Sequence, residues 1–385
     1  MFMNKRIAVF TGTRAEYGLL YWLLRDIEDA TDLDLSLIVS GTHLSSEFGH
    51  TVDQITSDGF KVAERVEMLL SSDSDVGTVK SLGLGIIGYA DALSRQRPDM
   101  LVLLGDRYEA LGIAQAAMLM KIPILHIHGG EITEGAYDDA IRHAITKLSF
   151  LHATSTDEYR RRVIQLGEEP ERVRTVGAIG LDHLERSSFM TSDEISESLD
   201  FDLGKQFAVM TYHPVTLADE SPVETFRNIA SALDKYPKLN VIITYPNADE
   251  GGRQIIPLIE SYAQNNSDRV AVVTSLGQRR YLSAIKNATL VIGNSSSGII
   301  EVPSFKVPTV NIGARQRGRL AAESVLHCEP DEQSISESIA KALRLSETGK
   351  LEDITNPYGN GDAVSAILEM IRSAKVGSIK TFYDI

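Results

Sequence analysis

The sequence predicts an α/β protein made of two domains, each built on a doubly wound parallel sheet. Three observations lead to this fold class. Apolar runs of strand length alternate with helix-like stretches along the chain, an order typical of parallel sheets. Polar and titratable residues collect directly after these runs, as they do at the carboxyl ends of such strands. The chain of 385 residues is longer than one typical domain and indicates two.

The clearest strand–helix–strand unit lies within residues 101–143. Its two apolar runs, 101–104 and 122–127, flank a helical stretch over 108–121, so we expect two neighbouring parallel strands. Titratable residues lie at or after the ends of both runs: Asp106, Arg107, His126, His128, Glu131, Asp138, Asp139, Arg142 and His143. This concentration of acids and bases at adjacent strand ends favours proton-transfer chemistry over simple binding.

The first predicted strand, 6–13, runs into a Gly-Thr turn before an amphipathic helix over 17–27. The free backbone N–H groups of such a turn can bind an anion, with Arg14 beside them. An ordinary strand–helix turn with a surface arginine is the alternative. A second predicted strand, 35–42, ends at His43, which places another titratable group at a carboxyl strand end.

Two predicted helices carry further signals. A helix over 76–97 contains glycines that lower its helix propensity and fit either close packing or subunit contact: Gly83, Gly85 and Gly88. On the helical stretch 138–148, two aspartates stand four residues before Arg142 and His143, so each pair shares one helix face. Simple surface ion pairs are the alternative interpretation.

The domain borders follow from the change in composition after a predicted strand over 173–179. The polar stretch 185–204 is interpreted as the linker region. We therefore expect an N-terminal domain over residues 1–185, a C-terminal domain over 186–361, and a last helix within 362–385 that packs back on the N-terminal domain.

The second half repeats the alternation, with predicted strands over 207–212, 239–244, 270–274, 289–293 and 307–312. Polar residues again follow these strands: His213, Asn247, Asp249, Ser275, Asn294 and Arg315. Two doubly wound domains with facing carboxyl edges would form a cleft.

The stretch 294–298, Asn-Ser-Ser-Ser-Gly, precedes a predicted helix and suits a phosphate group. Small residues let an oxyanion approach backbone N–H groups, and a helix N-terminus favours negative charge; N-capping by serine is the alternative. Glu301 lies on the first turn, where a carboxylate can accept two ribose hydroxyls. Arg317 and Arg319 flank Gly318 and form either a solvated basic loop or a pyrophosphate clamp.

Candidates for general acid–base catalysis are Asp106, Glu131, Asp138 and His213, since histidine titrates near neutrality. His126 and His128 lie at the end of one predicted strand and are interpreted as facing opposite sides of the sheet; we expect His126 in the core and His128 in the site. Neither H-x-x-x-H nor H-E-x-x-H occurs, and we expect no metal and no cofactor.

Composition limits the partners. The net charge is −15 and the pI about 5.1, which disfavours nucleic acid and anionic membranes as partners. A single cysteine, Cys328, excludes an internal disulfide framework and a thiolate zinc cluster. No apolar run reaches the roughly 18 residues that would cross a bilayer, and no secretory pattern opens the chain, so the expected location is the cytoplasm.

A set of motifs together resembles the UDP-N-acetylglucosamine 2-epimerase family. The motifs are TGTRAEYG, GDRYEA, HIHGGE, DDAIRHAITKLSFLH, YHP, YPNADEG, GNSSSGIIE and NPYGNG, and the resemblance covers nearly the whole chain, residues 6–372. The resemblance is closer to the hydrolysing branch, which makes N-acetylmannosamine and UDP for sialic acid synthesis. It implies the GT-B architecture, with two Rossmann-like domains and UDP in the interdomain cleft, and a homodimer or homotetramer.

The resemblance also implies a mechanism. A base removes the C2 proton of the sugar while UDP leaves C1, which gives 2-acetamidoglucal; water then adds, and C2 is reprotonated on the opposite face. By motif position Asp106 and Glu131 lead as acid and base, with Asp138 third. His213 and Arg14 would steady the diphosphate. The other implied contacts are His43, Arg107, His128 and Arg142 at the sugar end, Ser296, Ser297, Gly298 and Glu301 at phosphate and ribose, and Asn247, Asp249 and Arg315 for substrate or UDP.

One position departs from the family pattern. Many members carry glutamate where this chain has His128, in the pattern H-x-E-x-G, so either Glu131 replaces that glutamate or His128 itself acts as the base. A close sub-branch acts on a UDP-linked 2,4-diacetamido-trideoxy sugar, and no residue separates the two substrates. A GT-B glycosyltransferase is disfavoured by the carboxylates within 106–143. A non-catalytic UDP-sugar sensor is the third alternative.

Overall fold

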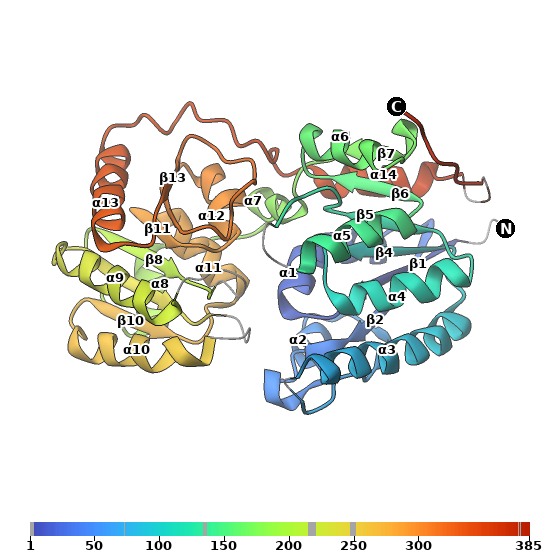
Figure 1. Ribbon diagram of the computed structural model, residues 1–385, viewed down its shortest axis with the longest axis horizontal. Helices are drawn as coiled ribbons and strands as arrows, with labels where there is room; N and C mark the ends of the chain where they lie inside the picture. Colours follow the sequence, from blue (N-terminus) through green and yellow to red (C-terminus); the bar gives the residue numbers. More distant parts are fainter. Residues whose placement is uncertain are drawn as a thin grey trace. The chain divides into compact units, whose positions relative to one another are not determined.

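The computed structural model describes residues 4–72, 74–133, 137–214, 221–246, 252–375, 377 and 379–385. The chain forms two compact units (Figure 1). Unit 1 comprises Met1–Glu131, Tyr137–Glu185 and Tyr358–Ile385, and unit 2 comprises Ile132–Ala136 and Arg186–Pro357. The chain thus returns to unit 1 at Tyr358, whereas the sequence prediction has it return at residue 362.

Unit 1 is built on a seven-stranded sheet with the order β3-β2-β1-β4-β5-β6-β7, in which every pairing is parallel. The strands are β1 (Lys5–Thr11), β2 (Leu33–Ser40), β3 (Val62–Val66), β4 (Met100–Leu104), β5 (Ile124–Ile127), β6 (Leu151–Thr154) and β7 (Val173–Thr175). The order of strands reverses between β1 and β4. In doubly wound sheets, ligands bind at the carboxyl ends of the strands beside such a reversal.

Helices cover both faces of this sheet (Figure 1). They are α1 (Arg14–Glu28), α2 (Val52–Ser57), α3 (Asp75–Gln96), α4 (Tyr108–Leu119), α5 (Tyr137–Leu148), α6 (Asp157–Gln165), α7 (Asp182–Arg186) and α14 (Ala363–Ser373). One core joins α1 and α14 to the sheet, and a second joins α3 and α4 to its other face. The carboxylate of Asp182 accepts the N–H groups of Ala363 and Val364 at 3.0 and 3.2 Å, which fixes the start of α14 to unit 1.

Unit 2 repeats the architecture on a six-stranded sheet with the order β10-β9-β8-β11-β12-β13, again all parallel. The strands are β8 (Phe207–Thr211), β9 (Asn240–Thr244), β10 (Val270–Val273), β11 (Leu290–Gly293), β12 (Thr309–Ile312) and β13 (Val325–Cys328). The helices are α8 (Ser192–Leu199), α9 (Pro222–Asp234), α10 (Gly252–Asn265), α11 (Gly277–Asn287), α12 (Ser297–Ile300) and α13 (Glu332–Glu347). Here the order reverses between β8 and β11.

Two features differ from the sequence prediction. The stretch 185–204, interpreted as a linker, contains α8, because Thr191 and Glu194 form a capping box and Ile195 is buried. The edge strands β3 and β13 were not predicted. A strand at a sheet edge is less buried, so it lacks the continuous apolar run that marks a central parallel strand.

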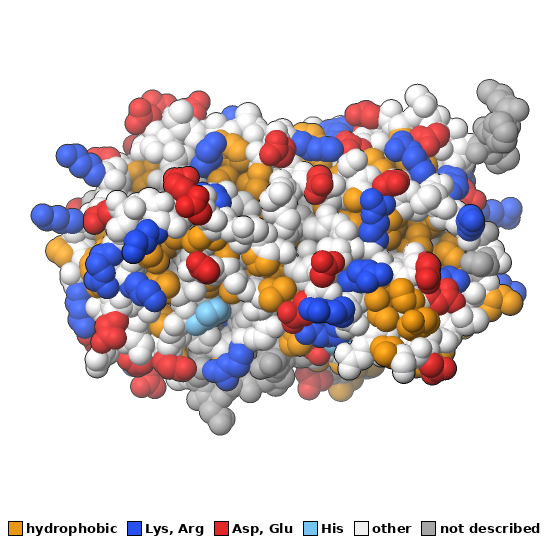
Figure 2. All heavy atoms as spheres, turned by 90° about the horizontal axis from the view of Figure 1, so that it is seen from above, with side chains coloured by type: hydrophobic (Ala, Val, Ile, Leu, Met, Phe, Trp, Pro, Cys, Tyr) orange, Lys and Arg blue, Asp and Glu red, His pale blue; other side chains and the backbone are white. Residues whose placement is uncertain are grey.

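Charges of both signs are interspersed on the face that Figure 2 displays, so an anionic ligand must be held by local groups. None of the helices in the described ranges combines the length and apolar character needed to cross a bilayer.

Candidate active site

Arg142 organises the carboxyl ends of β4 and β5 in unit 1. Its side chain is 2% exposed, and its guanidinium forms an ion pair with Asp106. Nη1 donates to the backbone oxygen of Glu131 at 2.8 Å and lies 3.6 Å from Oδ1 of Asp139. One buried cation therefore ties the loop after β4, the loop after β5 and the first turn of α5 together, with Asp138 in that same turn.

The carboxylate of Glu131 is held in a buried position by two side chains. Ser155 Oγ donates to Glu131 Oε1 at 2.9 Å, and His128 Nδ1 lies 3.2 Å from the same oxygen. The Ile179 N–H donates to His128 Nε2 at 3.3 Å. An accepting Nε2 leaves the proton of a neutral ring on Nδ1, so His128 donates to Glu131 and orients it.

His128 reaches this position through an uncommon backbone conformation, with φ at +65°. His126 is fully buried, and its Nε2 lies 2.7 Å from the carbonyl oxygen of Gly105. Burial lowers the pKa of His126 to about 3. The structure therefore places His126 in the core and His128 beside Glu131. The reason is not strand alternation, because residues two apart on a strand share a face. His128 lies just past the end of β5, and its left-handed backbone conformation turns its side chain away from that of His126.

The turn after β1 differs from the expectation of an open anion site. Glu16 Oε2 accepts the N–H groups of Gly12 and Thr13 at 2.8 and 2.9 Å, as the carboxylate of a capping box does. The donors expected to bind an external anion are thus occupied by the chain itself. Arg14, at the start of α1, is exposed.

The prediction that His43 lines the sugar end is not supported by its surroundings. The ring is fully buried, and its nitrogens lie 2.9 Å from Thr11 Oγ1 and 2.7 Å from Thr51 Oγ1. Burial lowers its pKa to about 4. His43 is therefore a neutral structural residue that joins the ends of β1 and β2.

Sequence reasoning missed Glu109 and assigned Glu16 no role. Glu109 is fully buried in the first turn of α4, with Oε2 3.4 Å from Nε of Arg107. The spacing of Thr13 and Glu16 matches a capping box and could have identified Glu16. No comparable signal marks Glu109, because its burial arises from the packing of α4 beside the end of β1.

In unit 2, a fully buried amide joins the two strands at the reversal of strand order. Asn294, after β11, accepts the backbone N–H of His213 and donates to its backbone oxygen, both at 2.7 Å. The backbone oxygen of Asn294 accepts Arg315 Nη1 at 3.0 Å and Gln316 Nε2 at 2.9 Å. His213, Asn294 and Arg315 are thus brought together from the ends of β8, β11 and β12.

Sequence reasoning expected His213 to titrate near neutrality, and its surroundings do not support this expectation. Its side chain is buried, and burial together with the charge of Arg315 lowers its pKa to about 3. At neutral pH the ring is uncharged, so it can meet an anion as a hydrogen-bond donor rather than as a cation.

The stretch 294–298, which was predicted to bind a phosphate at a helix N-terminus, is followed by a shorter helix than expected. The helix after it, α12, is four residues long, too short for the helix dipole that the prediction invoked. The N–H groups of Ser297 and Gly298 already donate to Ser295, to its Oγ at 3.4 Å and to its backbone oxygen at 3.1 Å. The motif can therefore offer mainly its serine hydroxyls, with Glu301 at the end of α12. A Cβ at Gly298 would lie 2.8 Å from Thr309 Cγ2, so packing on β12 also requires a glycine there.

Gly293 sets the separation of β8 and β11 at this site. Its φ is +130°, and a Cβ there would lie 1.9 Å from the Thr211 carbonyl oxygen. We expect Gly293→Ala to lower the free energy of unfolding by about 3 kcal/mol, since strain and overpacking add. Urea denaturation followed by circular dichroism measures this loss. An unchanged unfolding midpoint would show that β11 tolerates the side chain.

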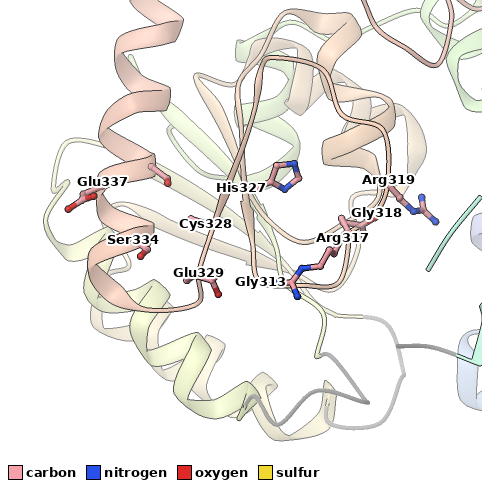
Figure 3. A pocket seen from close by; sticks show the side chains of 11 residues that line it. Gly313, Arg317, Gly318, Arg319, His327, Cys328, Glu329, Ser334 and Glu337 are labelled. Atoms are coloured by element: carbon pink, nitrogen blue, oxygen red, sulfur yellow. The ribbon is translucent and has the colours of Figure 1, made fainter. Parts of the chain in front are cut away.

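A cavity of about 520 Å³ opens at the carboxyl ends of β12 and β13 (Figure 3). Arg317 and Arg319 line it on the loop after β12, and Glu329 and Glu337 line it from β13 and α13. Because two glutamates balance two arginines, the cavity is not the purely cationic clamp that pyrophosphate would favour.

Two predicted binding residues, Asn247 and Asp249, lie outside the described residues. Within the described ranges, no three side chains of His, Cys, Asp or Glu gather closely enough to hold a metal ion.

The sequence matches the UDP-N-acetylglucosamine 2-epimerase family over residues 25–372. The chain belongs to this family. It is 40% identical over 328 residues to the GDP/UDP-N,N'-diacetylbacillosamine 2-epimerase (hydrolyzing) of Campylobacter jejuni, and 85% of each chain is covered. It is 34% identical over 389 residues to the polysialic acid biosynthesis protein P7 of Escherichia coli, with 99% of this chain and 98% of the relative covered.

The fold of this epimerase-family protein has a counterpart among solved structures. The crystal structure of UDP-GlcNAc 2-epimerase from Neisseria meningitidis bound to UDP-GlcNAc matches with a TM-score of 0.80 at 19% identity, covering 96% of this chain and 100% of that chain. The predicted fold class, two parallel-sheet α/β domains of GT-B type, is confirmed. The resemblance that the motifs carry is confirmed by the family match.

Proposed function

We propose that this epimerase-family protein is a hydrolysing 2-epimerase of a UDP-linked 2-acetamido sugar. A base removes the proton from C2 while the C1–O bond to UDP breaks, which leaves a C1–C2 double bond. Water then adds its oxygen to C1, and a proton returns to C2 on the opposite face. The products are UDP and the free 2-epimeric sugar, and no electrons are exchanged with a cofactor.

The cluster around Arg142 carries this proposal. Elimination and hydration need two proton-transfer groups, and the structure offers the carboxylates of Asp106 and Glu131. The buried guanidinium of Arg142 pairs with the carboxylate of Asp106 and with the backbone oxygen of Glu131, and so holds the two residues at the same sheet edge. Asp138 is the third candidate, in the first turn of α5. A glycosyltransferase needs an acceptor pocket rather than a group of carboxylates at the sugar, so the same cluster argues against that alternative.

We assign the base to Glu131 rather than to His128. Both ring nitrogens of His128 are engaged, one with Glu131 Oε1 and the other with the Ile179 N–H. A ring held in this way orients its neighbour and keeps it available for proton transfer. His128 is therefore a positioning residue in the proposed mechanism.

The nucleotide is assigned to unit 2. His213 and Arg315 would contact the diphosphate, with the hydroxyls of Ser296 and Ser297 beside Gly298 as further donors, and Glu301 would accept the ribose hydroxyls. A neutral His213 donates a hydrogen bond to the departing phosphate, and the negative charge beside it favours protonation of the ring.

The proposal also has to specify which sugar the substrate carries. UDP-N-acetylglucosamine would give N-acetylmannosamine for sialic acid-type synthesis, and the 34% identity to protein P7 supports it. The 40% identity to the Campylobacter enzyme, named for diacetylbacillosamine, supports a 2,4-diacetamido-2,4,6-trideoxy sugar. We favour the diacetamido sugar because that relative is the more similar of the two.

Proton NMR in heavy water tests the proposal. The purified protein is given each UDP-sugar separately, and the GDP form of the diacetamido sugar, with no metal or cofactor added. Release of free 2-epimeric sugar deuterated at C2, with the nucleotide, is the expected result. An epimer still joined to UDP would indicate non-hydrolysing epimerisation, and binding without turnover would indicate a sensor; either result contradicts the proposal.

An apolar surface on unit 1 supports the further proposal of a homo-oligomer. Exposed side chains on α3 and at the end of α4 form this surface: Val76, Val79, Leu84, Ile87, Met118, Leu119 and Met120. The side chain of Ile87, for example, is 66% exposed. The two helices pack against each other, exposed apolar side chains gathered on neighbouring elements are typical of protein contacts, and we propose a second copy of the chain as the partner.

Ile87→Glu should reduce the oligomer to a smaller species, because a buried unpaired charge at an interface is costly. Light scattering coupled to size-exclusion chromatography measures the molar mass. Arg161→Glu, a charge change at an exposed position of α6 outside this surface, is the control. A monomeric wild-type protein, or an Ile87→Glu protein of unchanged mass, contradicts the proposal.

A further inference from the structure

Two carboxylates outside the proposed mechanism meet where the strand order of unit 1 reverses. Glu109, on α4, is fully buried, and Glu16, on α1, is 8% exposed. A Cβ at Gly12 would lie 3.4 Å from both Glu16 Oε2 and Glu109 Cβ, and one at Gly41 would lie 3.3 Å from Glu109 Oε1. The two glycines leave the room that both carboxylates occupy.

The two carboxylates have different partners. Glu16 is held by backbone donors, the N–H groups of Gly12 and Thr13. Glu109 faces Arg107, with Oε2 3.4 Å from Nε and Oε1 3.5 Å from Nη2. Within the described part of the chain, Glu109 Oε2 has no hydrogen-bond partner beyond this ion pair. The main charged contact of Glu109 is therefore the residue that follows Asp106.

The charges around the pair balance only if one carboxylate is protonated. Arg107 is the cation that acts on both, and the other titratable groups facing them are the phenols of Tyr89 and Tyr108. Burial raises the pKa of each phenol, so both are neutral. Burial, and then the charge of Glu109, raises the pKa of Glu16 to about 7.

We propose that Glu109 is a positioning residue of the reaction, which holds Arg107 at the carboxyl end of β4. The inference rests on the proposed function. When Glu16 ionises, two buried carboxylates compete for one guanidinium, and Arg107 is drawn away from its place beside Asp106. Activity should therefore decline on the alkaline side through the position of Arg107.

A double-mutant cycle tests the coupling. We expect Glu109→Gln to lower kcat/KM about 100-fold, the scale of a misplaced binding group, with UDP affinity unchanged by calorimetry. Arg107→Gln should cost a similar factor, and the double variant should be no slower than Arg107→Gln alone, because interacting residues are non-additive. Glu109→Asp, which keeps the charge, should recover part of the rate.

The pH profile provides a second, independent readout. Glu16→Gln keeps an oxygen to accept the N–H groups of Gly12 and Thr13 but cannot ionise. Wild-type kcat/KM should fall as the pH rises through about 7, and this fall should be absent in the variant. This test uses only the wild type and Glu16→Gln, so it does not depend on whether a Glu109 variant folds.

The outcomes separate the two proposals. A wild-type protein that turns over none of the nucleotide sugars overturns the proposed function and this inference together. If the wild-type protein turns over a nucleotide sugar, three results would each overturn this inference alone. They are losses that multiply in the double variant, normal activity of Glu109→Gln, and a Glu16→Gln pH profile identical to that of the wild type.

Discussion

Glu131→Gln should lower kcat about 10²- to 10⁴-fold, the range expected on loss of a general acid or base, and should leave UDP affinity unchanged. The amide oxygen can still accept Ser155 Oγ and His128 Nδ1, which hold the carboxylate in the wild-type protein, but the group can no longer take a proton. The measurements are the rate of UDP release from the sugar nucleotide and a calorimetric titration with UDP.

His128→Gln separates the two candidates for the base. If His128 only orients Glu131, this variant should lose less activity than Glu131→Gln. Glu369→Gln, at an exposed position on α14, is the control for a change of charge and should be fully active. A larger loss in His128→Gln than in Glu131→Gln would transfer the role of base to His128.

Glu16→Gln should stabilise the protein at pH 8 and leave its stability at pH 4 nearly unchanged. The pKa of Glu16 is raised in the folded state from 4.5 to about 7, so its contribution to stability is complete below pH 4.5 and is lost as the pH rises through about 7. The glutamine stays neutral throughout. The difference in unfolding free energy at pH 8 should be about 3 kcal/mol, measured by urea denaturation at several pH values.

Glu194→Gln is the matched control for this pH dependence. Glu194 occupies the same capping-box position in α8, but its carboxylate is exposed, and the backbone N–H of Thr191 lowers its pKa. This variant should therefore show no gain at pH 8. Equal stability of Glu16→Gln and wild type at both pH values would mean that Glu16 is ionised in the folded protein.

Much of the candidate site could be predicted because parallel strands bring their carboxyl ends to one edge. Asp106 follows one central strand and Glu131 the next, and the pairing of β4 with β5 places them at the same edge. These inferences need only local patterns and the regular geometry of a parallel sheet.

Other partners could not be predicted, because they depend on which segments meet in space. Arg142 and Asp106 are 36 residues apart, and no pattern in the sequence marks them as a pair. Asn294 joins the end of β8 across 81 residues, and the burial of Glu109 depends on how α4 packs beside the end of β1. The short length of α12, by contrast, has a local cause that the prediction overlooked, because Pro303 follows three residues after its end and cannot continue an α-helix.

The sequence by itself determined the fold class, the family and the chemical types of residue at the strand ends, since these follow from periodicity and from motifs that are local in the chain. The tertiary structure decided the charge states and roles of those residues. It made His213 and His43 neutral through burial, turned His128 toward Glu131, and put Glu16 beside Glu109. The physical reason is that a pKa depends on desolvation and on nearby charges, and both arise only when distant segments pack together.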